Sequence, residues 1–431
     1  MGPDGLPEWL LRLGAPLLTE PIAALFRRSL MDSYVPMQWK GAHITPVPKI
    51  PQPKEPSDFR PISITSVLCR TFEKMLIKRF VYPALTDKGF QGELVDQFAF
   101  RPSGSTTSAI VYLLDKITSL LESNQYVRVV ALDFSKAFDT VRHSELSRKL
   151  DSVPMSDQVY HWIMGYIDRR YHCTKYDGKL SQQERINASV VQGSAVGPVS
   201  FIVTASDLKT TVGGNEMAKY ADDTYLLVPA SNECSIGLEL ANIEEWAKVN
   251  NLKLNRKKSL EMVVSRRRLP VAPSILPGIE RVNELTVLGV ILQDDLRMDK
   301  QVSNSIARAN SDLFALKTLK SHGLSSEALS QVCRMTLVSK LAYASPAWKG
   351  FSSVDELSRL GAVERKARRW GFCDSQESLC DILDNADKEL FNKVLNQRHH
   401  SLHTLLPPIK TTGYNLRQRG HPYELPRKTA L

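Results

Sequence analysis

The chain has 431 residues, of which 42% are apolar and 24% charged, so its composition is globular and excludes a disordered polypeptide. Lysine and arginine outnumber aspartate and glutamate by 56 to 46, and the net charge of +10 favours a polyanionic partner, either nucleic acid or a phospholipid surface. No apolar run is long enough to span a membrane and no signal-peptide pattern opens the chain, so we expect an intracellular protein without membrane partners.

The N-terminal third predicts a helical extension followed by extended chain and further helices. Residues 1–40 are typical of short helices, whereas prolines throughout residues 41–62 exclude a helix there. Helical patterns follow at 66–80 and 104–122. Residues 126–134 are β-branched and continuously apolar in the middle, which predicts a buried strand.

The rest of the chain predicts a few more mixed elements and then a helical region. The expected elements are helices at 156–169, 197–210 and 235–250, a hairpin at 217–228 and a strand at 286–292. From about residue 300 to 405 the pattern is helical, and a polar tail follows. This order predicts an α+β fold followed by an all-α segment.

The six cysteines are scattered without a Cys-x-x-Cys pair, which is typical of reduced thiols in an intracellular protein. One group offers zinc ligands, because Cys373 and Cys380 precede a run that contains His399, His400 and His403. Its spacing fits no common zinc finger, so we favour ordinary thiols and leave zinc binding by these residues open.

Carboxylates occur at two points where strands are expected to end. Asp133 closes the apolar strand, and Ala221-Asp222-Asp223 forms the tip of the hairpin. If the two strands are neighbours in one antiparallel sheet, the three carboxylates converge, and such clusters bind hard cations such as Mg²⁺. Two bound metals can activate a 3′-hydroxyl and stabilise departing pyrophosphate, which is the chemistry of nucleotide polymerisation. An Asp-Asp pair alone is more typical of a solvated turn, so the surrounding motifs decide between the two readings.

Those motifs resemble reverse transcriptases of the non-LTR (LINE-like) retrotransposon family. Three palm motifs occur in order: Ala131-Leu-Asp-Phe-Ser-Lys-Ala-Phe-Asp139, Gln192-Gly-Ser-Ala-Val-Gly-Pro198 and Tyr220-Ala-Asp-Asp223. Upstream, Pro46-Val-Pro-Lys49, Asp58-Phe-Arg-Pro-Ile-Ser63 and Gln97-Phe-Ala-Phe-Arg-Pro102 are similar to the fingers motifs of that branch. Downstream, Trp246, Asn251-Leu-Lys-Leu-Asn-Arg-Lys-Lys-Ser259 and Leu288-Gly-Val-Ile-Leu292 resemble its final palm motifs. The resemblance covers about residues 40–300.

The resemblance implies a right-hand polymerase. Its parts would be an N-terminal helical extension at 1–40, fingers at 41–125, a palm with part of the fingers at 126–300, and a helical thumb with a C-terminal tail at 301–431. Residues 301–431 hold 19 basic and 12 acidic residues, so most of the net charge lies in the predicted thumb. We expect that surplus to grip template and primer phosphates without reading sequence.

The resemblance also assigns the catalytic triad. Asp133, Asp222 and Asp223 would be the catalytic residues and would hold two Mg²⁺ ions, with Mn²⁺ as a possible substitute and Asp223 as the least direct ligand.

Six further residues would contact the incoming nucleotide. Lys49 and Arg60 would clamp its triphosphate, although as isolated residues they are also typical of solvated loop cations. Phe138 would exclude a ribose 2′-hydroxyl, with a plain core aromatic as the alternative. Gln192 and Gly193 would form a turn that lets the backbone approach the nucleotide. Lys258 would protonate pyrophosphate, or belong to a solvated run of charges.

The expected activity is RNA-directed DNA polymerase, which extends a DNA 3′-end on an RNA template with deoxynucleoside triphosphates. A non-catalytic nucleic-acid-binding remnant and an RNA-dependent RNA polymerase are the alternatives. Nuclear action fits a retroelement enzyme. No endonuclease pattern precedes the fingers motifs, so we expect a polymerase core, from a truncated element, a fragment or a host-kept domain. The copied RNA, the insertion target and the oligomeric state leave no signature in the residues.

Overall fold

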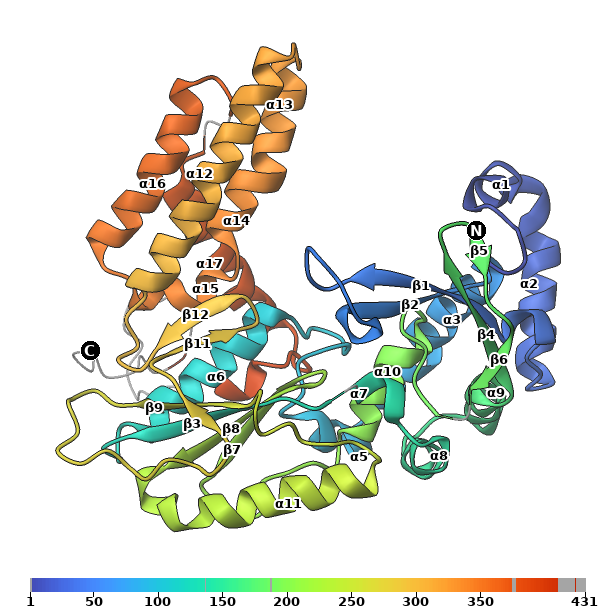
Figure 1. The fold of residues 1–431 in the computed structure, drawn as a ribbon, viewed down its shortest axis with the longest axis horizontal. Helices are drawn as coiled ribbons and strands as arrows, with labels where there is room; N and C mark the ends of the chain where they lie inside the picture. Colours follow the sequence, from blue (N-terminus) through green and yellow to red (C-terminus); the bar gives the residue numbers. More distant parts are fainter. Residues whose placement is uncertain (1, 136, 187, 374–376, 410–422, 424–431) are drawn as a thin grey trace.

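The computed structural model describes residues 2–135, 137–186, 188–373, 377–409 and 423. The fold has three parts, a central sheet, a second sheet formed mainly near the N-terminus, and an upright group of C-terminal helices (Figure 1). The prediction of an α+β fold followed by an all-α segment is confirmed. Among the described residues, no helix combines the length and the apolar character that crossing a bilayer requires.

The central sheet is built around one apolar strand. Its strand order is β10-β9-β3-β8-β7, with bounds β3 (Val127–Leu132), β7 (Glu216–Tyr220), β8 (Asp223–Pro229), β9 (Leu260–Val264) and β10 (Glu280–Arg281). Val127 and Val129 of β3 face one buried cluster, whereas Val130 and Leu132 face the other. A strand with apolar residues on both faces must be covered on both, and this explains the continuous apolar run in the sequence.

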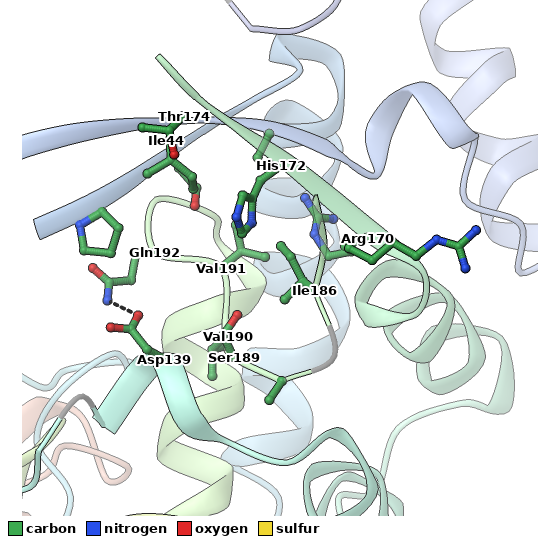
Figure 2. Close-up of a pocket in the computed structure, with 15 residues that line it drawn as sticks. Ile44, Asp139, Arg170, His172, Thr174, Ile186, Ser189, Val190, Val191 and Gln192 are labelled. Atoms are coloured by element: carbon green, nitrogen blue, oxygen red, sulfur yellow. Dashed lines mark hydrogen bonds between the residues drawn. The ribbon is translucent and has the colours of Figure 1, made fainter. Parts of the chain in front are cut away.

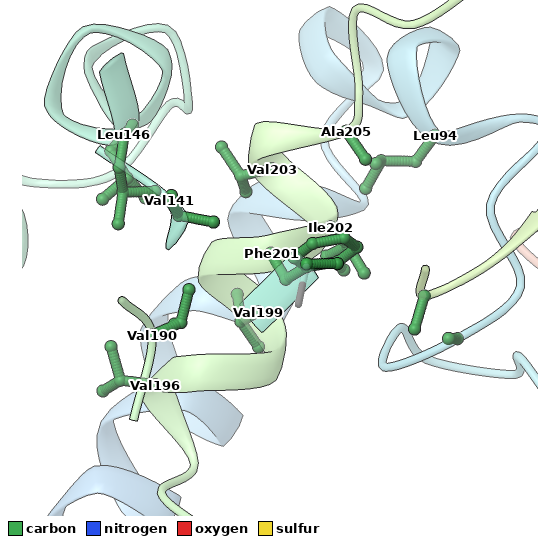
Figure 3. Close-up of a cluster of buried hydrophobic side chains, with 14 of the residues drawn as sticks. Leu94, Val141, Leu146, Val190, Val196, Val199, Phe201, Ile202, Val203 and Ala205 are labelled. Carbon is green, nitrogen blue, oxygen red and sulfur yellow. The ribbon is translucent and has the colours of Figure 1, made fainter. Parts of the chain in front are cut away.

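Helices cover the two faces of this sheet. On one face lie α6 (Thr106–Leu120) and the C-terminal helices, and on the other lie α10 (Val196–Thr204) and α11 (Ile236–Val249). Every residue of α10 except Pro198 is buried, and its side chains leave the helix in several directions, as Val196, Val199 and Ile202 illustrate (Figure 3). The helix predicted at 197–210 is therefore present but ends six residues earlier than expected.

The second sheet joins segments that are far apart in the sequence. Its order is β2-β1-β4-β5, with β6 also paired to β4, and the bounds are β1 (Gly41–Pro48), β2 (Phe59–Thr65), β4 (Arg170–Tyr176), β5 (Lys179–Leu180) and β6 (Glu184–Ile186). The proline-rich segment thus forms the hairpin β1–β2. The prediction that it contains no helix is wrong at its tip, where Pro56–Asp58 forms a 3₁₀ turn, because proline is tolerated at the first position of a helix. Strand β4 lies parallel to β1, with Gly41 opposite Tyr171 and Ile44 opposite Thr174. No local pattern in the sequence predicts β4, β5 or β6.

Further helices lie within the first 170 residues of the chain. They are α1 (Glu8–Leu13), α2 (Ala15–Met31), α3 (Val67–Leu76), α4 (Tyr82–Leu85), α5 (Lys88–Gln91), α7 (Ala137–Thr140), α8 (His143–Asp151) and α9 (Asp157–Ile167). A π-helical turn at Ile77–Val81 links α3 to α4. Ser66 caps α3 and Ser105 caps α6, because each serine oxygen accepts a backbone N–H of the first turn.

The predicted single strand at 286–292 is wrong, because two strands form there. They are β11 (Glu284–Val287) and β12 (Val290–Gln293), paired in a two-stranded hairpin. Leu288 and Gly289 make the turn, with φ of 48° and 88°. A two-residue turn with both φ values positive reverses the chain in the middle of one apolar run. Because no polar residue marks this turn, the sequence pattern looks like a single strand.

The C-terminal part is helical, as predicted; it packs at its base against α6 on one face of the central sheet and extends away from there (Figure 1). Its helices are α12 (Asp299–Ser321), α13 (Ser326–Cys333), α14 (Ser339–Ala342), α15 (Ser345–Trp348), α16 (Val354–Arg369) and α17 (Leu379–Asn396). The polar tail expected after residue 405 lies mostly outside the described residues.

Candidate active site

Asp133 and Asp222 lie at the same end of two adjacent strands. Asp133 directly follows β3, and Asp222 directly precedes β8. The register of β3 and β8 sets Leu132 opposite Thr224, so the two carboxylates meet at one edge of the sheet. The hairpin turn consists of Ala221 and Asp222, whereas Asp223 is already the first residue of β8 and pairs with Tyr220.

The three carboxylates influence one another electrostatically. Burial raises the pKa of Asp222, and the charge of Asp133 adds to this, while the guanidinium of Arg60 opposes it. For Asp223, the surrounding protein and the charges of Asp222 and Asp133 raise the pKa to about 6. Asp223 keeps an exposed surface, so water still reaches its carboxylate. A cation among these groups would relieve the repulsion.

An open cleft of about 1250 Å³ runs between the two sheets at this point. Asp133 and Asp222 line it, and Asp223 and Gly193 are the predicted site residues that do not. The other predicted residues that line the cleft are Lys49, Arg60, Phe138, Gln192 and Lys258. The cleft therefore sets carboxylates of the central sheet opposite cations of the β1–β2 hairpin.

Most of the cations are side chains of exposed residues near the tip of that hairpin. The Lys49 ammonium donates a hydrogen bond to the Ser57 carbonyl oxygen (2.9 Å), and the Lys49 backbone N–H donates to the Asp58 carbonyl oxygen (2.7 Å). Lys54, which the sequence analysis missed, also lines the cleft. No motif singles out Lys54, because it is one of several polar residues between β1 and β2.

Phe138 is half-buried and stacks on Phe201 of α10, with ring centroids 4.5 Å apart and planes 25° apart. One face of the ring is thus fixed by the core while the residue still borders the cleft. Both readings from the sequence therefore describe part of its surroundings.

Gln192 is held on two sides. Its side-chain amide nitrogen donates to Asp139 Oδ1 (2.8 Å), and its backbone carbonyl oxygen accepts the Ser63 backbone N–H (2.8 Å). Figure 2 shows the contact with Asp139 beside an adjacent chamber of about 430 Å³. This chamber shares five lining residues with the cleft: Ile44, Pro61, Asp139, Thr174 and Gln192. Because a carboxylate only accepts hydrogen bonds, the NH₂ group must face Asp139. The sequence analysis did not assign a role to Asp139.

Gly193 packs against the second sheet, which we also call the N-terminal sheet. Its φ is +109°, and a Cβ atom there would lie 2.5 Å from the Ser63 carbonyl oxygen of β2. The close approach that requires glycine is therefore to β2.

The helix that follows this turn is capped by a buried glutamate. The Glu73 carboxylate of α3 accepts the backbone N–H groups of Ala195 (2.8 Å) and Val196 (3.3 Å) at the start of α10. Burial raises the pKa of Glu73, and these hydrogen bonds oppose that shift. Glu73 thus fixes α10 and the turn before it, a role that the sequence did not reveal.

Lys258 is the member of its basic run that lines the cleft. Arg256 pairs instead with Glu244 (2.6 Å) and donates to the Pro277 carbonyl oxygen (3.2 Å). The structure therefore answers which of these cations borders the site.

No group of three or more His, Cys, Asp or Glu side chains within the described ranges is arranged so that it could hold a metal ion as it stands. This applies to the carboxylate triad, of which two members face the cleft, and to the cysteine and histidine residues considered for zinc. Cys373 is buried and contacts Cys333 across the helical part, whereas Cys380 is exposed.

The sequence profile of the reverse transcriptase (RNA-dependent DNA polymerase) family matches residues 50–292, more than half of the chain. The chain is 24% identical, over 81% of its length, to the probable RNA-directed DNA polymerase from transposon X-element of Drosophila melanogaster. It is 26% identical, again over 81%, to the corresponding protein of transposon BS from the same fly. It spans 39% and 40% of those two relatives, about two fifths of their length.

A solved telomerase structure from Candida tropicalis, in complex with a fragment of telomeric RNA, is similar with a TM-score of 0.48 and 13% identity, over 83% of this chain and 62% of that one.

Adjacent strands carry two carboxylates toward a cleft that basic side chains also line, and the family match assigns the class of protein. The chain belongs to the reverse transcriptase (RNA-dependent DNA polymerase) family. Its relatives are polymerases of non-LTR retrotransposons, so the resemblance found in the sequence is confirmed.

Proposed function

We propose that this chain is an RNA-directed DNA polymerase that extends a DNA 3′-end with deoxynucleotides copied from an RNA template. One observation carries the proposal: Asp133 and Asp222 lie at the same end of adjacent strands. Across one cleft they face the cations Lys49 and Arg60. A nucleoside triphosphate has matching needs, because its phosphates require both metal ions and basic side chains. For a retroelement polymerase, the site of action would be the nucleus.

The carboxylates fit Mg²⁺ by their chemistry. Mg²⁺ is usually bound through one or two protein carboxylates together with substrate phosphates, and Asp133 and Asp222 supply that number. Asp223, beside the cleft, would tune the charge of the pair and act as the least direct ligand. When bound, the ions would stabilise charge during in-line attack of a 3′-hydroxyl on the α-phosphate.

The cations would bind and orient the triphosphate. Arg60 offers a planar fork of donors that matches phosphate oxygens. Lys49 has three N–H groups, of which the Ser57 carbonyl occupies one, so two remain for phosphate. Lys258, on the opposite wall, is the candidate to donate a proton to departing pyrophosphate.

Phe138 would act as the gate against ribonucleotides. Its ring cannot retreat easily, because Phe201 supports it from behind. A 2′-hydroxyl at that ring would lose its hydration without gaining a partner, which disfavours ribonucleotides. Replacing Phe138 with alanine should therefore raise the use of ribonucleotides.

We assign the parts of the hand as follows. Residues 41–125 form fingers, to which β4, β5 and β6 from the palm stretch are added, since they join the sheet of β1 and β2. Residues 126–300 otherwise form the palm, 301–431 the thumb and tail, and 1–40 a helical extension. The RNA template and DNA primer would lie across the palm sheet.

Primer extension tests the function directly. A labelled DNA primer on an RNA template is incubated with all four deoxynucleotides and Mg²⁺, using the wild type, Asp222→Asn and the control Asp295→Asn. Asp295 is a carboxylate outside the cleft, paired with Arg297 (3.4 Å). We expect extension by the wild type and the control but not by Asp222→Asn. Equal extension by all three proteins would contradict the proposed role of Asp222.

The same experiment separates the alternatives. Tight binding of template and primer by the wild type without incorporation would identify a non-catalytic remnant. Preferred incorporation of ribonucleotides by the wild type would identify an RNA polymerase.

A further inference from the structure

Residues 96–98 extend the central sheet beyond its edge strand β7. The Lys219 N–H donates to the Asp96 carbonyl oxygen (2.7 Å), and the Phe98 N–H donates to the Lys219 carbonyl oxygen (2.9 Å). Gln97 and Lys219 thereby form a parallel bridge. This segment opens one of the fingers motifs, although it packs on the strand that leads to the catalytic turn.

The segment is firmly anchored. The buried Lys219 ammonium forms an ion pair with the Asp96 carboxylate (3.1 Å). The Arg101 guanidinium donates to the Gln97 carbonyl oxygen (3.2 Å) and thus holds the backbone from the other side. The Phe98 ring packs on Tyr112 of α6, with centroids 4.9 Å apart.

The side chain of Gln97 reaches from this segment to the turn between β7 and β8. It is fully buried, and its Oε1 atom accepts the backbone N–H groups of both Ala99 and Ala221, each at 3.0 Å. Both partners are donors, so the orientation of the amide is determined by them. The Gln97 amide nitrogen has no hydrogen-bond partner among the described residues. Only the oxygen of the Gln97 side chain therefore takes part in hydrogen bonds to the described residues.

The turn needs such a support. Ala221 has φ of +58°, a left-handed conformation that costs a residue with a Cβ atom roughly 1–2 kcal/mol. Ala221 is also buried, so its N–H cannot turn to water instead. The next residue along the chain is Asp222, so any change in the backbone of Ala221 also moves the Asp222 carboxylate.

We propose that Gln97 is a positioning residue for the carboxylates of the 220–223 turn, which it holds through the Ala221 N–H so that Asp222 stays beside Asp133 at the cleft. This inference deepens the proposed function, since it concerns the same site. It assigns Gln97 to the palm chemistry and not to nucleotide contact, because Gln97 does not line the cleft.

The test compares Gln97→Met with the control Phe98→Leu. Methionine has a similar length and no comparable acceptor, whereas Phe98→Leu loosens the same segment without touching the turn. Mn²⁺ binding to the full chain is measured by the loss of the free-ion electron paramagnetic resonance signal, together with kcat and KM for deoxynucleotide in primer extension. Thermal unfolding reports the stability of each protein.

We expect Gln97→Met to weaken Mn²⁺ binding and to lower kcat, each about 10- to 100-fold, with KM for deoxynucleotide within about twofold of wild type. Phe98→Leu should lower the melting temperature and leave Mn²⁺ affinity unchanged. Wild-type Mn²⁺ affinity in Gln97→Met, or an equal loss of affinity in Phe98→Leu, would overturn the proposal.

The metal measurement keeps this inference distinct from the proposed function. If the wild type binds Mn²⁺ and Gln97→Met binds it more weakly, but neither extends a primer, the proposed polymerase activity fails and the positioning role stands. If the wild type binds no Mn²⁺, the positioning role is overturned as well.

Discussion

The two sheets that border the cleft are built on opposite principles. The central sheet is covered on both faces, and Asp133 and Asp222 are set by the register of β3 and β8. In the N-terminal sheet, β2 is an edge strand, and Lys49, Lys54 and Arg60 are exposed around the hairpin that it forms with β1. The acidic half of the site is therefore rigid before any substrate arrives, whereas the basic half can adjust to one.

This contrast predicts where substitutions act. A carboxylate fixed by a buried sheet cannot be replaced by a neighbour, so its loss should be severe. An exposed cation has neighbours of the same charge and a flexible side chain, so its loss should be partly compensated.

The largest effect is expected for Asp133→Asn. We predict a loss of about 1000-fold in kcat for single-nucleotide incorporation, because the proposed metal ions would lose a carboxylate ligand. Asp223→Asn should lose about tenfold, since Asp223 does not line the cleft. Rapid-quench measurement of one incorporation checks both values, and a larger loss for Asp223→Asn than for Asp133→Asn would reverse the ranking.

A second effect should appear where the two halves touch. Gly193→Ala would set a Cβ atom 2.5 Å from the Ser63 carbonyl oxygen at a φ of +109°, so the turn would have to move away from β2. We predict a loss of about 3 kcal/mol in the free energy of unfolding, measured by urea denaturation. Gly178→Ala, also at positive φ but with open space around it, is the matched control and should lose about 1 kcal/mol. Equal losses would show that contact with β2 is unimportant.

The adaptable half predicts a smaller effect. Arg60→Ala should raise KM for deoxynucleotide about tenfold with little change in template binding, because one set of charge-assisted phosphate contacts is lost. Arg27→Ala, on an exposed surface of α2, serves as the control and should leave KM unchanged. A drop in kcat without any change in KM would assign Arg60 to the chemical step.

The smallest effect on catalysis is expected for the charged face of α16, whose substitution should change binding. Arg368 pairs with Glu364, so Arg365 and Arg369 are the better candidates for phosphate contact among the three arginines there. Replacing both with alanine should reduce the slope of log K against log salt by about 1.4–1.8 for template–primer binding, so the loss of affinity should be largest at low salt and shrink as salt is added. Arg368→Ala is expected to keep the wild-type slope, and fluorescence anisotropy at several salt concentrations measures all three proteins.

The strands that carry Asp133 and Asp222 were predictable from the sequence, and much of their support was not. An apolar strand ending in Asp133 and a hairpin bearing Asp222 are local patterns, and their pairing follows from burial. Strand β4 was missed because Arg170–Tyr176 alternates poorly and is only partly buried. Its place is decided by pairing with β1, which no local pattern encodes.

The supports of the site were hidden for the same reason. Asp139 and Gln192 lie 53 positions apart, and Gln97 and Ala221 lie 124 positions apart, so their hydrogen bonds exist only in the folded chain. The identity of each residue is visible in a motif, but its partner is not. Glu73 carries no motif, and only its burial against α10 reveals what it does.

The parallel pairing of β1 with β4 also governs the order in which the chain can fold. Gly41 lies opposite Tyr171, so 130 positions separate the paired residues. At a synthesis rate of about 5–20 residues per second, β1 emerges from the ribosome on the order of ten seconds before its partner. During that interval one edge of the β1–β2 hairpin is open to pairing with other chains. Nascent chains that stop before β4 should therefore aggregate, and the finished fold should form through a slow, non-local closing step.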